Sequence, residues 1–139
     1  MYFRHFKIRE LFNDCTSNEV CKCVREGHID HLLTLLSVLD EFREEFGNSI
    51  VVTSSFRDFH HNKRVGGVSN SQHMLGQAID FKSCSAPFET MVLAFKSFLE
   101  SSALRRFIGQ VIIYKQKQFI HVGLRTEIHK QLMFMYSYL

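Results

Sequence analysis

The chain of 139 residues lacks tryptophan, contains a single proline and has only seven glycines. It also lacks internal repeats, low-complexity tracts and any stretch with the composition of a linker. With hydrophobic residues at 45% and charged residues at 22%, the composition excludes a disordered chain. The length fits one domain, so we expect a single domain over residues 1–139 with a core rich in its 14 phenylalanines.

Long apolar runs are also missing. No segment approaches the length needed to span a membrane, and the first seven residues, MYFRHFK, lack the continuous apolar segment of a signal peptide. We therefore expect a protein without a membrane span that is made in the cytoplasm and meets a cell wall only after lysis or delivery by another factor. The net charge of +3 is too small to indicate a nucleic-acid partner, so we predict none, and we expect a monomer.

The four cysteines do not form a recognisable metal motif. Cys15, Cys21 and Cys23 share one short segment, but a Cys-x-Cys pair without a second pair is a weak zinc signal. We expect reduced thiols at these positions and at Cys84. If they were oxidised, three pairings are possible and the sequence does not choose among them.

Hydrophobic spacing predicts both helices and strands. Apolar residues recur every three or four positions in the helical segments and alternate or cluster in the strand-like ones. The predicted helices cover residues 6–13, residues 29–46 and a segment from about residue 85 to 99, and the predicted strands cover residues 49–54, 77–81, 110–114, 118–124 and 131–136. Without a strict strand–helix–strand rhythm, this order favours an α+β domain with a small antiparallel sheet packed against helices.

Three polar residues stand out as a potential metal site. His73 ends a polar loop, Asp80 lies on a short strand seven residues later, and Gly76 permits a turn between them. His121 lies on an apolar strand, where the two-residue period places it opposite Ile120 and Val122. Two histidines and a carboxylate match a catalytic zinc that keeps one position for water. From spacing alone, hydrogen-bonded core histidines remain an open alternative.

A longer pattern around these residues resembles a known family. The segment Ser71 to Asp80 has the form Ser-x-His-x-x-Gly-x-Ala-x-Asp, which resembles the signature of the zinc D-Ala-D-Ala carboxypeptidases. That family includes phage endolysins, and its fold is similar to the hedgehog signalling domain. The strand VTSSFR before it, the glycine-rich VGGVSNS and the later FIHV follow in the family's order. The resemblance covers nearly the whole chain except the cysteine-bearing segment and the last dozen residues.

This resemblance implies a function and a set of site residues. The implied zinc ligands are His73, Asp80 and His121, and the implied activity is hydrolysis of peptide bonds in peptidoglycan stem peptides, as a carboxypeptidase or an endolysin-type endopeptidase of phage or bacterial origin. Arg57 matches the arginine that binds a substrate carboxylate or the developing oxyanion; a surface ion pair with a nearby acid is the alternative. Ser71 and Gln72, beside the first ligand, either contact substrate or order the loop.

The sequence departs from the family where the general base is expected. Members carry a carboxylate three or six residues before the last histidine, and here Gln118 and Lys115 occupy those catalytic positions. Glu127, Asp58 or His129 could replace it, or a lysine whose pKa is lowered by the metal. Tyr114 is a poor base, because the ordinary tyrosine pKa is about 10. Alternatively, the domain is a non-catalytic zinc-containing module that binds cell wall or a protein.

Overall fold

The computed structural model describes residues 2–139 and contains a five-stranded sheet and four α-helices. The elements follow the chain as η1 (Ile8–Phe12), α1 (Ser17–Arg25), α2 (Ile29–Phe46), β1 (Val51–Ser54), α3 (Phe59–Arg64), η2 (Gln72–Leu75), β2 (Ala78–Lys82), α4 (Phe88–Ser101), η3 (Ala103–Phe107), β3 (Ile108–Tyr114), β4 (Phe119–Leu124) and β5 (Met133–Ser137). The η elements are short 3₁₀ helices. The α+β class expected from the sequence is confirmed, and the helix predicted over residues 29–46 matches α2.

The sheet has the strand order β1-β2-β4-β3-β5. The pairs β1–β2, β2–β4 and β3–β4 are antiparallel, whereas β5 runs parallel to β3. The expectation of an antiparallel sheet is therefore corrected to a mixed one. The reason is the connection over residues 125–132, which stays at the end of the sheet where β4 finishes and β3 begins and passes β3 to its free edge, so that β5 starts at the same end as β3.

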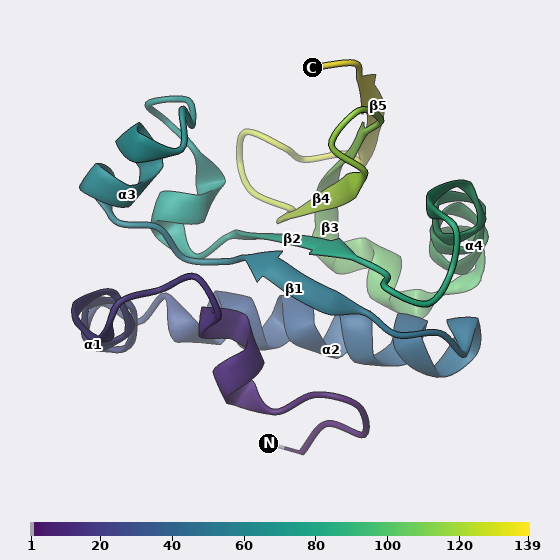
Figure 1. Cartoon of the computed structure of the whole chain (residues 1–139), viewed down its shortest axis with the longest axis horizontal. Coiled ribbons are helices and arrows are strands. Elements are labelled where there is room, and N and C mark those ends of the chain that lie inside the picture. The colour runs from purple at the N-terminus through teal and green to yellow at the C-terminus, as the bar shows by residue number, and fades with distance from the viewer. Residues whose placement is uncertain (1) are drawn as a thin grey trace.

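Helices and strands form two layers around an apolar core. In Figure 1, α2 runs beneath the sheet while α3 lies on the other side of it, and α4 lies beside the end of α2. Alternate residues of the strands face the helix layer and are fully buried there, including Ile79, Phe81, Ile120 and Val122. Four phenylalanines of α2, β2 and α4 pack against one another in this core, as expected from the composition: Phe42, Phe81, Phe95 and Phe98.

Two signals in the sequence account for the limits of α2 and for a helix that was not predicted. Gly47 ends α2 with φ 74°, a left-handed conformation that glycine adopts without strain. The segment Thr16–Glu19 is a capping box, in which the Thr16 hydroxyl accepts a hydrogen bond from the Glu19 amide and the Glu19 carboxylate accepts one from the Thr16 amide. This box begins α1, and the pattern Thr-x-x-Glu is readable in the sequence.

Among residues 2–139, no helix is both long and apolar enough to cross a bilayer. The cysteines are free thiols, with Cys23 buried in the core and Cys21 and Cys84 exposed.

Candidate metal centre

Three side chains from separate elements meet on the face of the sheet opposite the main helix layer. His73 comes from η2, while Asp80 and His121 are direct cross-strand partners on β2 and β4. His73 Nε2 lies 3.1 Å and His121 Nδ1 lies 2.9 Å from the same oxygen of Asp80, Oδ1. All three residues are buried. The structure thus brings together the three residues that the sequence singled out, across 48 residues of chain from 73 to 121.

The backbone around His73 determines which ring nitrogen faces Asp80. His73 Nδ1 donates to the carbonyl oxygen of Ser55 at 2.6 Å, which leaves Nε2 as the nitrogen with a free lone pair in the neutral ring. Ser55 is itself buried and its hydroxyl donates to the carbonyl oxygen of Leu11 in η1. The orientation of His73 therefore depends on the β1 end and on η1, two segments distant in sequence.

The turn that carries His73 is supported by the first turn of α2. Gly76 has φ 64°, and a Cβ added there would lie 2.8 Å from the Cβ of His28. His31 contacts the carbonyl oxygen of Leu75 through Nδ1 at 3.2 Å. Glycine at position 76 is thus required both by its backbone conformation and by the close approach of α2.

The donor set fits a zinc ion. The three ligand atoms lie within 4.8 Å of one another, and two donors at about 2.0–2.1 Å from a tetrahedral zinc are separated by about 3.3 Å. The two separations of 3.1 and 2.9 Å are close to that value. Neutral imidazole and carboxylate are ligands that zinc accepts, and three protein ligands leave one position for water or substrate. Among residues 2–139, no other group of three potential ligands meets this geometry.

Asp80 is ionised well into the acid range. Burial opposes its ionisation, but the charge of His73 and the hydrogen bonds from His121 and His73 outweigh burial and hold the pKa of Asp80 far below its usual range. A carboxylate that keeps its charge is the form that binds a cation. Asp80 therefore keeps the ionised form that a metal ligand requires.

Arg57 approaches the second oxygen of Asp80. Its Nη2 lies 3.7 Å from Asp80 Oδ2, while both histidines contact Oδ1. The side chain is largely buried, and its backbone amide donates to the carbonyl oxygen of His73 at 3.0 Å. The surface ion pair considered from the sequence is not what the structure shows: the acidic partner is Asp80, within the cluster.

Ser71 and Gln72 order the turn before His73. The Ser71 hydroxyl accepts a hydrogen bond from the His73 amide at 3.2 Å. Gln72 Nε2 donates to the carbonyl oxygen of Leu124 on β4 at 3.4 Å, while its Oε1 is buried against Gly123 without a hydrogen bond. Gln72 thereby connects the element that carries one histidine to the strand that carries the other.

The two positions expected to hold the base lie apart from the cluster. Lys115 places its Nζ 5.3 Å from the ring centre of Tyr136 and 5.9 Å from that of Tyr138. Tyr136 pairs with the buried Ile113 and bonds Lys96 of α4, so this contact is on the helix side of the sheet. Gln118, with φ 58°, closes the β3–β4 turn and lines a cavity with Lys82 and residues at the start of α4. The structure does not bring Lys115 or Gln118 to the three ligands.

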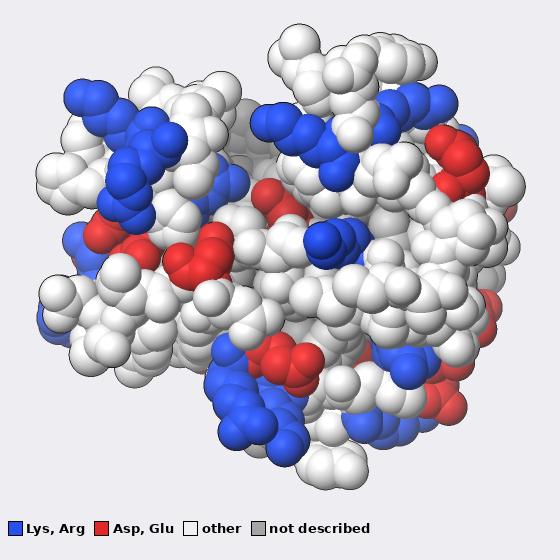
Figure 2. Space-filling view, viewed as in Figure 1, with Lys and Arg blue, Asp and Glu red and all other residues white. Residues whose placement is uncertain are grey.

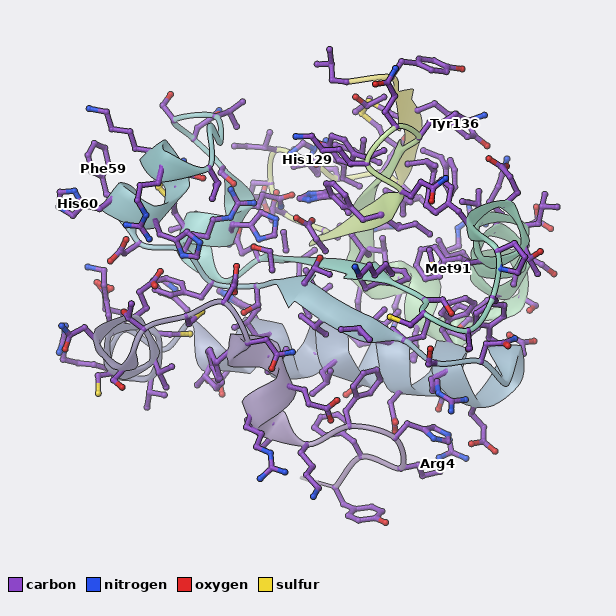
Figure 3. The ribbon with its side chains drawn as sticks, viewed as in Figure 1. Arg4, Phe59, His60, Met91, His129 and Tyr136 are labelled. Atoms are coloured by element: carbon purple, nitrogen blue, oxygen red, sulfur yellow. The ribbon has the colours of Figure 1, made fainter. Side chains whose placement is uncertain are left out.

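Of the three substitutes considered for the base, Asp58 and Glu127 contact other groups. Asp58 caps α3 by accepting a hydrogen bond from the His61 amide at 2.8 Å. Glu127 is almost fully exposed and lies 3.7 Å from Lys130. His129 lies on the loop between β4 and β5, on the side of the sheet that carries α3, as Figure 3 shows. Within residues 2–139, Asp80 provides the one carboxylate that bonds His73 or His121.

Tyr114 is a site residue that the sequence reasoning treated only as a poor base. It pairs with Phe119 at the end of the β3–β4 hairpin, and its ring stacks on that of Phe119 with centroids 4.4 Å apart. By the period of two, both lie on the face of His121. Burial raises the pKa of Tyr114 above its ordinary value, the charge of Asp80 raises it further, and Arg57 offsets part of this rise. The phenol therefore stays protonated, and its hydroxyl is able to donate a hydrogen bond.

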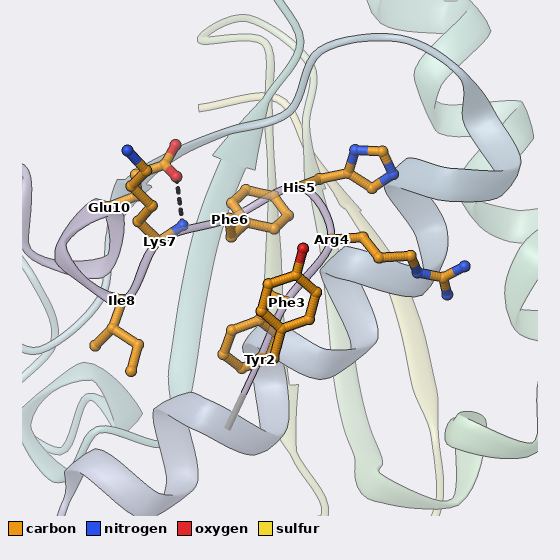
Figure 4. Close-up of a pocket in the computed structure, with 8 residues that line it drawn as sticks. All are labelled: Tyr2, Phe3, Arg4, His5, Phe6, Lys7, Ile8 and Glu10. Atoms are coloured by element: carbon orange, nitrogen blue, oxygen red, sulfur yellow. Dashed lines mark hydrogen bonds between the residues drawn. The ribbon is translucent and has the colours of Figure 1, made fainter.

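The surface is hollowed above this face of the sheet. Figure 2 shows the hollow between the part of the molecule that carries α3 and the part that carries β5, with acidic atoms at its floor and basic side chains on both sides. A separate cavity lies at the N-terminal segment, where residues 2–10 form all of its lining and Lys7 donates its amide to Glu10 (Figure 4). That cavity holds none of the three ligands.

Comparison with known proteins agrees with the geometry. Residues 4–123 match the profile of a family described as Peptidase M15. This match includes all three ligands and Arg57, and excludes β5. No curated protein matches the chain in sequence.

Proposed function

The chain belongs to the Peptidase M15 family, the zinc D-Ala-D-Ala carboxypeptidase-like peptidases, and we propose that it hydrolyses peptide bonds in the stem peptides of peptidoglycan. The reaction is that of a D-Ala-D-Ala carboxypeptidase or of an endolysin-type endopeptidase. The observation that carries this proposal is the cluster of His73, Asp80 and His121, whose ligand atoms lie within 4.8 Å of one another. We also propose that the protein acts as a monomer and reaches the wall after lysis or with a delivery factor.

Each residue of the site has a role that follows from its contacts. A zinc ion held by the three ligands would acidify a bound water and polarise the peptide carbonyl. Ser55 keeps His73 in the tautomer that presents Nε2. Arg57 provides a guanidinium beside the ligands that binds a substrate carboxylate or the developing oxyanion. Tyr114, on the same face of the sheet as His121, provides a protonated hydroxyl that would donate a hydrogen bond to the substrate.

The test is hydrolysis of purified wall by the zinc-loaded protein. We expect new amino termini or free D-alanine when the protein is incubated with peptidoglycan of several stem-peptide types. His121→Ala removes one ligand and should abolish release, whereas His60→Ala, at an exposed histidine outside the cluster, should not. Absence of release from every wall type at full zinc occupancy would contradict the proposal.

A second candidate function is a zinc-containing module that binds cell wall or a protein without cleaving it. The observation that favours it is that, among the described carboxylates, Asp80 alone bonds His73 and His121. Lys115 and Gln118 contact other parts of the molecule. Such a module would sediment with insoluble wall and release no new termini.

A further inference from the structure

Arg57 is held on three sides by this chain. Its Nε donates to the Ser54 hydroxyl at 3.2 Å, its Nη1 donates to Asn62 Oδ1 at 3.1 Å, and its Nη2 lies 3.7 Å from Asp80 Oδ2. A free arginine side chain has many rotamers, so each of these contacts restricts the plane of the guanidinium. Of the three partners, Asp80 is a proposed metal ligand and lies at the longest distance, so Ser54 and Asn62 are the ones that set the orientation of Arg57.

Asn62 is buried and uses both ends of its carboxamide. Its Oδ1 accepts from Arg57, and its Nδ2 donates to the carbonyl oxygen of Val68 at 2.8 Å. Its backbone carbonyl also accepts a hydrogen bond from the Gly67 amide at 2.9 Å. One side chain therefore connects the arginine to the glycine-rich loop that leads to His73. An aspartate of the same size would lack the donor that Val68 requires.

Gly67 leaves the space in which this contact forms. A Cβ added at position 67 would lie 2.1 Å from Asn62 Oδ1 and 2.8 Å from Arg57 Nη1. Unlike Gly66, Gly67 does not have a positive φ, so an alanine is compatible with the backbone there. The requirement for glycine at position 67 is consequently steric, and the atoms it protects are those of the Asn62–Arg57 hydrogen bond.

We infer that Asn62 is a positioning residue, which with Gly67 holds the Arg57 guanidinium toward the space beside the metal ligands, where it receives the carboxylate of a peptide substrate. This inference rests on the proposed function for its substrate, but the restraint on Arg57 does not. Asn62 touches no reacting atom. It acts by keeping Arg57 in one orientation. The side chain therefore loses its conformational entropy on folding rather than on substrate binding.

A first experiment observes Arg57 directly, without any activity. In the ¹⁵N-labelled protein, the Nε–H signal of Arg57 is identified by its loss in Arg57→Lys, and its exchange with solvent is measured. We expect slow exchange in the parent and at least roughly tenfold faster exchange in Asn62→Ala and in Gly67→Ala, because loss of the Nη1–Asn62 hydrogen bond lets the guanidinium turn away from Ser54, the acceptor of Nε–H. Asn70→Ala, an exposed asparagine in the same loop, is the matched control and should leave the exchange unchanged.

A second experiment measures what the orientation does for substrate. The probes are acyl-D-Ala-D-Ala and the same peptide with an amidated C-terminus, each assayed for cleavage by the zinc-loaded protein. We expect Asn62→Ala to reduce the preference for the free carboxylate by roughly tenfold, about the effect of one charge-assisted hydrogen bond, mainly through KM. A residue that served only the stability of the fold would lower the cleavage of both peptides equally.

The two experiments separate the possible failures. If the parent cleaves no peptide while Asn62→Ala and Gly67→Ala still speed the exchange of Arg57, the proposed function fails and the restraint on Arg57 stands. If both variants fold and leave the Arg57 signal unchanged, the positioning role is overturned. Because Gly67→Ala keeps the asparagine and Asn62→Ala keeps the glycine, a folding failure of one variant leaves the other to decide.

Discussion

At the scale of single residues, the site depends on groups that the chain places next to the ligands. The ligands were recognisable from the sequence because histidine and aspartate at that spacing suit a metal and resemble a family signature. Their neighbours were not, since Ser55 acts through its backbone carbonyl and Asn62 through a contact with an arginine five residues earlier. Every residue has a backbone carbonyl, and an asparagine side chain can bond many different groups, so the residue type alone reveals neither role.

Tyr114 gives the first prediction at this scale. Tyr114→Phe removes a donor that stays protonated at neutral pH, and we expect turnover to fall roughly tenfold or more while zinc content stays unchanged. The measurement is kcat on wall peptides alongside metal analysis. Phe119→Leu keeps the phenol and should retain more activity than Tyr114→Phe. Equal activity of Tyr114→Phe and parent would rule out a role for the phenol.

Gly123 gives the second prediction at the scale of single residues. A Cβ there would lie 2.3 Å from Gln72 Oε1, so Gly123→Ala should displace the carboxamide that joins η2 to β4. Gln72 precedes His73 in η2, and its carboxamide bonds the strand that carries His121. We therefore expect Gly123→Ala to weaken zinc affinity by roughly tenfold. Competition with a chromophoric chelator measures the affinity. The double variant Gly123→Ala/Gln72→Ala regains space and should recover part of the loss, and strictly additive effects of the two changes would contradict this account.

At the scale of elements, the site is assembled from pieces that hold one another by buried polar contacts. Helix α1, which was not predicted, joins α3 through Glu19 and His61, both buried, with His61 Nδ1 2.8 Å from Glu19 Oε2. The same carboxylate accepts the backbone amide of Asp58 at 3.1 Å, which is the residue after Arg57. Helix α1, in the cysteine-bearing segment, thus helps to fix the position of Arg57 through the backbone of the next residue, Asp58.

This contact predicts a pH-dependent stability. Burial alone would raise the pKa of Glu19, but hydrogen bonds from the Thr16 and Asp58 amides and from His61 outweigh it, so the pKa lies below 4.5. A depressed pKa in the folded state means that the stabilisation is present above about pH 4.5 and is lost as the pH falls toward the folded value. We expect Glu19→Gln to lower the free energy of unfolding by about 2 kcal/mol at pH 7.

Urea unfolding of the parent and of Glu19→Gln at several pH values provides the measurement. The difference between the two proteins should shrink as the pH falls below about 4.5, because the folded parent then takes up the proton on Glu19. Glu26→Gln, at an exposed acid that pairs with Lys22 on the same helix, is the control and should change stability by less than about 0.5 kcal/mol at either pH. A difference that stayed constant with pH would show that Glu19 carries no linked proton.

At the scale of the whole molecule, the two faces of the sheet have different roles, one packing against helices and the other carrying the candidate metal centre. The helix layer of α2 and α4 buries one face of the sheet, and the other face carries the ligands and opens to the hollow in Figure 2. The ligands come from three elements, so they are together only while the sheet is intact and η2 rests on α2. Folding and metal binding are therefore expected to be coupled.

This coupling is testable by adding and removing metal. At free zinc about 100 times its Kd, binding to the folded state alone stabilises by about 2.7 kcal/mol. We expect the melting temperature of the parent to rise on zinc addition and to fall again with a chelator. His121→Ala should lose this response, and His60→Ala should keep it. A parent whose melting temperature ignored zinc would contradict a site at these three residues.

The sequence by itself was sufficient for the class of fold, the long helix over residues 29–46 and the core of phenylalanines, because these depend on local periodicity and composition. It also singled out the three residues of the candidate metal centre, through their residue types and their resemblance to a family pattern. Tertiary structure alone decided the parallel direction of β5, the Glu19–His61 contact and the placement of Lys115 on the helix side of the sheet. Those features depend on how distant segments pack. No local pattern shows whether a loop passes a neighbouring strand before the next strand begins, or on which face of the sheet a side chain at a turn will lie.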